Sequence, residues 1–277
     1  MPKLPATPQC HTELATKVLC GFLREESHRA GFQKAVLGLS GGIDSALVVE
    51  LAARALGPEN VLAVAMPYRT SNPISLELAQ DSALHAGVAL EVVDISTMAD
   101  ACIDQAGETD SLRRGNIMAR ARMITLYDRS ARDNALVLGT SNKTELLLGY
   151  GTIHGDMASA LNPVGDLYKS QIVALSRHLG VPKAIIDRPP SADLWSGQTD
   201  EEELGFTYDA VDALLVRLVD ELWSRDQLIE AGFATDFVDG VRQRIRINQY
   251  KRRPPLIAKV ANRTVNLDFR YARDWGT

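Results

Sequence analysis

The chain has 277 residues and a mass of 30.2 kDa, which is enough for one large α/β domain or two small ones. Hydrophobic residues make up 45% and charged residues 23%, as is usual for a globular protein with a full core. No apolar run approaches the length of about 18 residues that a membrane span needs, and the N-terminus lacks a signal pattern, so we expect a cytoplasmic protein without a membrane partner. The net charge of −5 argues against a general nucleic-acid binder.

The hydrophobic pattern predicts short strands that alternate with helices. The first element is a helix over about residues 12–29. Short apolar runs then predict strands over 35–39, 61–66, 90–93 and 135–138. Between the strands, helices are expected at about 43–56, 74–86 and 112–130. Because this alternation requires crossover connections, we expect an α/β fold with a doubly wound parallel sheet flanked by helices.

The C-terminal part is predicted to be mainly helical from about Gly180 onward, and the last 25 residues are predicted to be irregular. No repeat, low-complexity segment or long linker divides the chain. We therefore interpret residues 1–277 as a single domain whose C-terminal helices pack around the same core.

The turn after the first predicted strand holds the most informative motif, Ser40-Gly41-Gly42-Ile43-Asp44-Ser45. Its glycines lie where a strand turns into a helix, so the backbone can bend tightly and point several N–H groups into one concavity. Two serine hydroxyls and the positive end of the helix favour phosphate as the occupant. Ligands of such sheets bind beyond the carboxyl ends of the strands, which is where this loop lies.

Asp44 changes what the loop can bind. A carboxylate repels a bare phosphate unless a divalent cation lies between them, which argues for a magnesium–nucleotide complex. The alternative from the residues alone is an ordinary strand-to-helix turn in which Asp44 starts the helix. The loop is not a Walker A motif, because the lysine that this motif requires is absent.

Polar residues later in the chain supply further candidates. Arg120, Arg122 and Tyr127 fall within two helical turns, and helical spacing places Arg120 and Tyr127 on one face and Arg122 on another. Arginines on a helix are more often part of a solvated face. Beyond the strand at 135–138 a small polar cluster leads into another helix, where Glu145 is a possible second metal ligand.

The region from Val241 to Leu267 contains eight basic residues and no acidic ones. Such a segment could contact the phosphates of a small ligand, RNA or an acidic face of another subunit. A solvated basic tail is the alternative.

The loop at 40–45 resembles the Ser-Gly-Gly-x-Asp-Ser loop of the N-type ATP pyrophosphatases, which cleave ATP between the α and β phosphates to adenylate a substrate. Together with GTSNKTE at 139–145, the Gly-Asp pairs at 155–156 and 165–166, and PSADL and GQTDE within 190–201, it makes nearly the whole chain similar to the NAD synthetase family. The resemblance implies the Rossmann-like, adenine nucleotide alpha-hydrolase-like fold. It also implies amidation of nicotinic acid adenine dinucleotide (deamido-NAD) with ammonia and ATP, through an acyl-adenylate, as the last step of NAD biosynthesis (EC 6.3.1.5).

The resemblance assigns roles to individual residues. The positions that match the family's ATP contacts are Ser40, Gly41, Gly42, Ile43, Asp44, Ser45, Thr140, Lys169 and Ser191. The two acidic magnesium ligands match Asp44 and Glu145. The positions that match contacts to deamido-NAD are Arg120, Tyr127, Asp156, Tyr250 and Lys251. Asp44, Lys169 and Asp156 are expected to carry catalysis, with Lys169 offsetting charge on departing pyrophosphate and Asp156 a candidate proton acceptor for ammonia.

The chain departs from the family pattern at four positions. Ser191 stands where many members have threonine, and Tyr250 stands where others have histidine. Ile153 and Ala160 stand where some bacterial members have a lysine and an aspartate. Contacts to deamido-NAD around residues 150–162 are therefore expected to differ from those of such members.

The family also implies the nitrogen source and the assembly. Glutamine-dependent members carry a fused nitrilase-like domain, and we expect none here because the synthetase segment begins within about 15 residues of the start. We expect direct use of ammonia, with a separate glutaminase subunit left open, and a homodimer with the dinucleotide near the subunit interface. The rival interpretations are a related adenylating enzyme acting on xanthosine monophosphate, aspartate or tRNA, and a nucleotide sensor or RNA-binding module without catalysis.

Overall fold

The computed structural model describes residues 5–107, 110–190, 200–265 and 268. Four strands form one sheet in which every neighbouring pair is parallel. The strands are β1 (Lys34–Gly38), β2 (Val61–Ala65), β3 (Ala89–Val92) and β4 (Ala135–Leu138), in the order β3-β2-β1-β4. Each predicted strand is confirmed.

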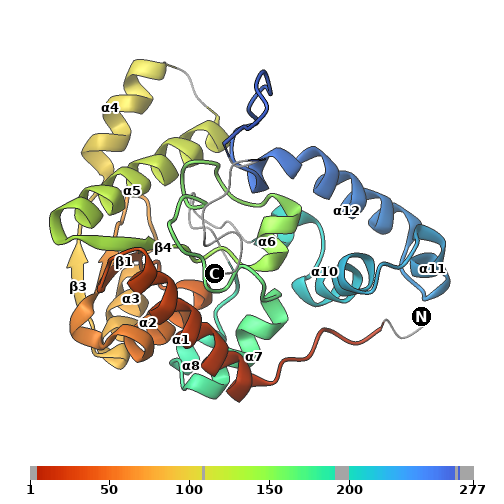
Figure 1. Cartoon of the computed structure of the whole chain (residues 1–277), viewed down its shortest axis with the longest axis horizontal. Coiled ribbons are helices and arrows are strands. Elements are labelled where there is room, and N and C mark those ends of the chain that lie inside the picture. The colour runs from red at the N-terminus through yellow and green to blue at the C-terminus, as the bar shows by residue number, and fades with distance from the viewer. Residues whose placement is uncertain (1–4, 108–109, 191–199, 266–267, 269–277) are drawn as a thin grey trace.

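Helices cover both faces of the sheet (Figure 1). One face carries α1 (Thr12–Arg29), α2 (Ile43–Leu56), α3 (Pro73–Ala86) and α7 (Lys169–Leu179), and the other carries α4 (Ser96–Ala106) and α5 (Ser111–Asp133). Successive residues of the central strand β1 alternate between the layers, because Ala35 and Leu37 are buried with the first group and Val36 with the second. The doubly wound parallel sheet is thus confirmed.

The sequence pattern does not predict helix α4. Its 11 residues bury only Ser96, Ala99 and Ile103, and two of these side chains are small. A helical period that rests on one large apolar residue is too weak to be distinguished from a loop.

The part of the chain beyond the sheet is mainly helical, as predicted. It contains α6 (Lys143–Leu148), α8 (Lys183–Ile186), α9 (Asp200–Leu204), α10 (Tyr208–Leu215), a π-helical turn (Val216–Asp220), α11 (Arg225–Glu230), α12 (Thr235–Ile247) and a 3₁₀ turn (Gln249–Arg252). All of these elements except α8 and the 3₁₀ turn contribute to a cluster of their own, which includes Leu148, Leu214 and Val238 together with Tyr168 before α7. The interpretation of the whole chain as one domain stays a prediction.

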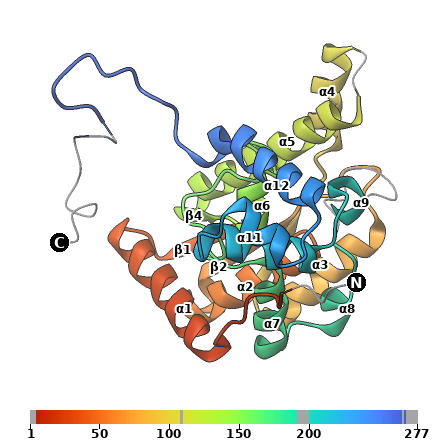
Figure 2. The same ribbon diagram turned by 90° about the vertical axis from the view of Figure 1, so that its right-hand side faces the viewer.

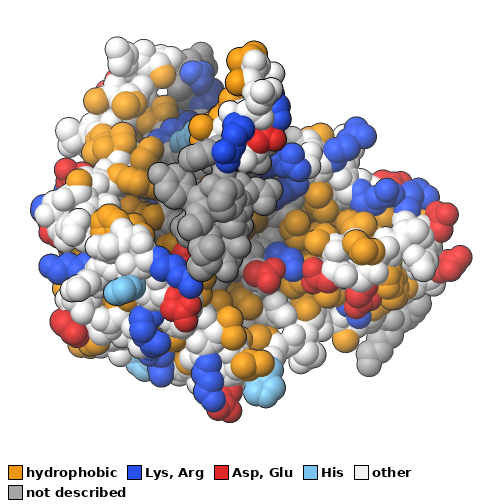
Figure 3. Space-filling model, viewed as in Figure 1, with side chains coloured by type: hydrophobic (Ala, Val, Ile, Leu, Met, Phe, Trp, Pro, Cys, Tyr) orange, Lys and Arg blue, Asp and Glu red, His pale blue; other side chains and the backbone are white. Residues whose placement is uncertain are grey.

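Residues 253–264 form neither helix nor strand, in keeping with the irregular C-terminus that the sequence predicts. Figure 2 shows this segment extending away from the body of the molecule. On the described part of the face in Figure 3, Lys and Arg side chains lie among Asp and Glu side chains rather than in one basic patch. None of the described helices has the length and apolar character that a bilayer crossing demands.

Candidate active site

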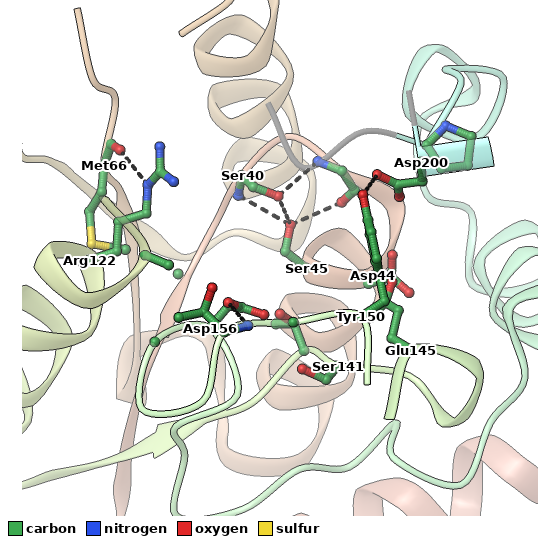
Figure 4. Close-up of a pocket in the computed structure, with 18 of the residues that line it drawn as sticks. Ser40, Asp44, Ser45, Met66, Arg122, Ser141, Glu145, Tyr150, Asp156 and Asp200 are labelled. Atoms are coloured by element: carbon green, nitrogen blue, oxygen red, sulfur yellow. Dashed lines mark hydrogen bonds between the residues drawn. The ribbon is translucent and has the colours of Figure 1, made fainter. Parts of the chain in front are cut away.

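A cavity of about 930 Å³ opens beyond the carboxyl ends of the strands (Figure 4). The glycine loop, α5, the loop after α6 and the start of α7 line it. Open parallel sheets bind their ligands at this edge. The volume lies near the upper end of the range of roughly 300–1,000 Å³ for small-molecule sites, so the cavity suits a nucleotide-sized ligand.

The glycine loop, residues 40–45, is held in shape by its own serines. Ser40 N–H donates to Ser45 Oγ at 3.2 Å, and Ser45 Oγ donates to Gly42 O at 2.9 Å. Gly41 has a φ of +75°, and a Cβ atom there would lie 2.3 Å from the carbonyl oxygen of Ser75 in α3. Glycine is therefore required for the loop to pack against α3, which confirms the tight strand-to-helix turn predicted from the sequence.

The amine of Lys169 lies between two carboxylates in the cavity wall. Its Nζ atom is 2.5 Å from Asp44 Oδ2 and 3.7 Å from Glu145 Oε1. Asp44 is the second residue of α2, Glu145 belongs to α6, and Lys169 is the first residue of α7. Three segments that are far apart in the sequence thus bring together three predicted site residues beside the glycine loop.

Asn142 holds both carboxylates from the other side. Its Nδ2 donates to Asp44 Oδ1 at 2.9 Å, and its backbone N–H donates to Glu145 Oε2 at 3.2 Å. Each carboxylate therefore has one oxygen fixed by Asn142 and the other facing Lys169. Sequence reasoning assigned no role to Asn142, although an asparagine three residues before a glutamate is typical of the capping box that it forms with Glu145.

Burial and mutual charge shift the pKa values of this group. Burial, reinforced by the charge of Asp44, raises the pKa of Glu145 to about 8. Burial disfavours the charged form of Lys169, but the carboxylates of Asp44 and Glu145 outweigh it, so the pKa of Lys169 is raised. Lys169 therefore remains a cation at neutral pH, while Glu145 readily takes up a proton.

The raised pKa of Glu145 predicts a pH dependence of stability in the absence of ligands. The folded chain keeps the Glu145 proton up to a pH of about 8, whereas the unfolded chain releases it near pH 4.5. The unfolded state binds fewer protons in this window, so the free energy of unfolding should fall as the pH rises from 4.5 to 8. Thermal unfolding at several pH values would measure this fall, and Glu145→Gln should make it shallower. An equally steep fall in Glu145→Gln would contradict the assignment.

Asp200 adds a third carboxylate that sequence reasoning did not single out. Its two oxygens accept hydrogen bonds from the hydroxyl groups of Tyr150 and Tyr208, at 3.0 and 3.2 Å. Burial raises the pKa of Asp200, and the charge of Lys169 opposes this rise. Tyr208 also places its ring 5.1 Å from Lys169 Nζ. Asp200 is the first residue of an acidic run in the sequence, and the fold buries it.

The loop after α6 gathers a second group of predicted residues. Lys251 Nζ donates to the carbonyl oxygens of Gly149 and Gly151, at 2.8 and 2.9 Å. Asp156 Oδ1 accepts from the backbone N–H of Thr152 at 2.8 Å. Burial within the cavity wall raises the pKa of Asp156, and the charge of Lys251 opposes this rise. Lys251 and Asp156 both line the cavity.

Helix α5 contributes two arginines to the cavity. Arg120 donates to the carbonyl oxygen of Ile153 at 3.4 Å, and Arg122 Nε donates to that of Met66 at 3.1 Å. Both residues line the cavity, Arg120 from one face of α5 and Arg122 from another. The curved wall follows more of the helix than one face. Tyr127 is 41% exposed and does not belong to the described cavity lining.

The remaining predicted residues are distributed as follows. Thr140 and Tyr250 line the cavity, and Tyr250 is also exposed. Ser191 lies outside the described residues.

Asp44 and Glu145 are the best candidates for holding a cation. Carboxylate oxygens are the ligands that magnesium prefers, and at nucleotide sites it commonly takes one or two carboxylates together with substrate phosphates. Within the described ranges, no group of three or more His, Cys, Asp or Glu side chains suits a metal ion. The residues therefore fit a magnesium ion shared with nucleotide phosphates rather than one enclosed by protein ligands alone.

Known proteins of one family are similar to this chain over nearly its whole length. The family model described as NAD synthase matches residues 15–255. The chain is 59% identical over 266 residues to the NH(3)-dependent NAD(+) synthetase of Trichlorobacter lovleyi. The alignment covers 96% of this chain and 97% of that protein.

Two solved structures resemble this one over most of its length. The NH3-dependent NAD synthetase from Campylobacter jejuni, in complex with the nitrate ion, aligns with a TM-score of 0.77 and 38% identity, covering 90% of this chain and 100% of that one. The NMN synthetase from Francisella tularensis aligns with a TM-score of 0.79 and 29% identity, covering 90% of this chain and 99% of that one.

Proposed function

The chain belongs to the NAD synthase family, and we propose that the cavity at the carboxyl edge of its sheet carries out the family's reaction with the residues described above. That reaction is the ATP-dependent amidation of deamido-NAD with ammonia to NAD, the final step of NAD biosynthesis, and the enzyme is a ligase (EC 6.3.1.5). The observation that carries the assignment of residues is the meeting of Lys169, Asp44 and Glu145 beside the glycine loop.

The phosphates of ATP would lie on the glycine loop. The N-terminus of α2 offers partial positive charge there, and the Lys169 amine supplies a full one. Thr140, at the end of the neighbouring strand β4, faces the same cavity. Ser191 keeps its proposed ATP contact on the basis of the family pattern alone.

Magnesium would be held by Asp44 and Glu145. When bound with ATP it supplies positive charge that offsets the charge of the phosphates. The donor set supports this role, because each carboxylate keeps one oxygen that is not fixed by Asn142. In the ligand-free chain those two oxygens face Lys169.

Deamido-NAD would occupy the side of the cavity formed by α5 and the loop after α6. Arg120 and Lys251 supply positive charge there for its phosphates or pyridine carboxylate, and Asp156 lies beside them. Tyr250 adds an exposed aromatic ring to the same wall, and Tyr127 stays a proposed contact from the family pattern. Ile153 stands where some members carry a lysine, and its carbonyl oxygen accepts a hydrogen bond from Arg120.

Two displacements make up the proposed reaction. An oxygen of the pyridine carboxylate attacks the α-phosphorus of ATP, the bond to the bridging oxygen breaks, and pyrophosphate leaves. Lys169 is placed to stabilise the negative charge that grows on pyrophosphate. Ammonia then attacks the acyl carbon of the adenylate, AMP leaves, and one N–H proton passes to an acceptor, for which we propose Asp156.

We also propose a cytoplasmic homodimer that uses ammonia directly. The exposed apolar side chain of Ile124 on α5 supports this proposal, since a second copy would cover it. A separate glutaminase subunit remains compatible with an open cavity into which ammonia can diffuse.

The proposed function is tested by incubating the purified chain with deamido-NAD, Mg–ATP and ammonium while NAD, AMP and pyrophosphate are measured. We expect the three products in equal amounts, with no NAD when glutamine replaces ammonium. A parallel reaction with nicotinic acid mononucleotide tests acceptor size, since one structural relative is an NMN synthetase. Turnover of the mononucleotide alone would overturn the proposed acceptor, and AMP release without any amide would overturn the amidation.

A further inference from the structure

Helix α7 begins at the proposed catalytic lysine, Lys169. Its own capping side chain, Gln171, accepts through Oε1 from the N–H of the preceding Tyr168 at 3.0 Å and does not serve the N–H groups of Lys169 and Ser170. The first N–H groups of a helix have no partner within the helix and must find one elsewhere. Here they find it on two other helices.

Thr144 and Asp212 take these N–H groups. Lys169 N–H donates to Thr144 Oγ1 at 3.1 Å, and Ser170 N–H donates to Asp212 Oδ2 at 2.7 Å. Thr144 Oγ1 also donates its own proton to Asp212 Oδ1 at 2.6 Å, so the two acceptors are bonded to each other. We call these three hydrogen bonds the relay. Thr144 and Asp212 are both fully buried, so no water competes for these bonds.

The relay joins the two segments that carry the charge cluster. Thr144 directly precedes Glu145 in α6, and Ser170 directly follows Lys169 in α7. Asp212 lies in α10 and bonds to both segments, so it fixes the start of α7 relative to α6. The Lys169 amine reaches Asp44 and Glu145 from the backbone position that is set in this way.

We propose that Asp212, acting through Thr144, is a positioning residue that places the Lys169 amine for the reaction. This inference rests on the proposed function, because it assumes that Lys169 acts on ATP. An aspartate suits the position since it alone, at this length, offers two acceptor oxygens and no donor. Asparagine would turn an N–H₂ group toward either the Ser170 N–H or the Thr144 hydroxyl.

The test compares Thr144→Val with Thr144→Ser. Valine keeps the shape of threonine but removes the hydroxyl, so it breaks two bonds of the relay, whereas serine keeps them. We expect Thr144→Val to lower kcat by about 10- to 100-fold, as a small misplacement of a catalytic group does, with the KM for ammonium little changed. Thr144→Ser should restore kcat to within about threefold of the unaltered enzyme. Asp212→Asn should lower kcat as Thr144→Val does. If Asp212→Asn does not fold, Thr144→Val alone tests the positioning role.

A matched control separates positioning from loss of packing. Thr125 is also a buried threonine, but its hydroxyl donates only to the carbonyl oxygen of Ala121 in its own helix and it does not line the cavity. Thr125→Val should leave kcat unchanged. In a Lys169→Met background, Thr144→Val should reduce the residual rate and the affinity for ATP no further, because the two changes act through one amine.

Three outcomes would overturn the inference. They are an unaltered kcat in Thr144→Val, an equal loss in Thr125→Val, and losses that multiply in the double variant. Failure of the proposed function is distinguishable from all three, because it would appear as no NAD formation by the unaltered chain.

Discussion

Replacement of Lys169 by methionine is expected to lower kcat for NAD formation by about 10³-fold, the loss seen when a preorganised group that stabilises developing charge is removed. Methionine keeps much of the length and apolar volume of lysine and removes only the ammonium group. In the structure that group lies 2.5 Å from Asp44 Oδ2 and 3.7 Å from Glu145 Oε1, next to the glycine loop. Its charge would stabilise pyrophosphate as the bond to the α-phosphorus breaks. Steady-state kinetics with saturating Mg–ATP and deamido-NAD measures the effect.

The same change should also destabilise the ligand-free chain, because the carboxylates of Asp44 and Glu145 lose the cation between them. Rates must therefore be expressed per folded molecule, as measured by urea unfolding. Lys143→Met is the matched control, since Lys143 is also a mostly buried lysine, paired at 2.9 Å with Asp220 but absent from the cavity lining. A kcat in Lys169→Met within tenfold of that in Lys143→Met would refute the catalytic role of Lys169.

The core of the fold follows from sequence pattern because three of its strands, β1, β2 and β4, are short, apolar and mostly buried. The run at 135–138 is Ala-Leu-Val-Leu, and three of its four residues are buried, so hydrophobicity alone marks it as a strand. Helix α4 lacks such a mark, since most of its side chains face solvent. The order of the strands in the sheet is set by pairings between segments that lie far apart in the sequence, and no local pattern predicts it.

The candidate site likewise contains some residues that the sequence identifies and others that it does not. Asp44, Glu145 and Lys169 could be named from the resemblance, because each occupies a recognisable motif, and the fold brings them together. Asp200 lies in the GQTDE motif, but the motif assigned it no role, and Asp212 lies in no motif. Their surroundings depend on partners dozens of residues away, such as Tyr150 for Asp200 and Thr144 for Asp212.

Helix α5 shows a further limit of spacing arguments. Seven residues separate Arg120 from Tyr127, which places both on one side of an ideal helix. The cavity wall nevertheless includes Arg122 and leaves Tyr127 at the surface. Which residues of a helix line a site depends on the segments packed against it: Arg120 donates to Ile153 in the loop after α6, and Arg122 donates to Met66 after β2.

Replacement of Gly41 by alanine is expected to weaken ATP binding by at least about 100-fold, or about 2.7 kcal/mol. Two effects combine at this position. A non-glycine residue with a φ of +75° costs about 1–2 kcal/mol of backbone strain. In addition, the new Cβ atom would lie 2.3 Å from the carbonyl oxygen of Ser75, which is backbone of α3 and cannot turn aside as a side chain would. The loop must therefore move away from α3, and the N–H groups that bind phosphate move with it.

Gly31→Ala separates these two effects. Gly31 has a similar φ of +80°, but no atom lies within 4 Å of a Cβ built there. It should therefore show the strain as a modest loss of thermal stability, with an unchanged Kd for Mg–ATP. Calorimetric titration of Mg–ATP into both variants measures the difference in affinity, and thermal unfolding measures the shared strain. If Gly41→Ala bound ATP as tightly as Gly31→Ala, the loop would not hold the phosphates. The proposed contact between Lys169 and these phosphates would then be contradicted as well.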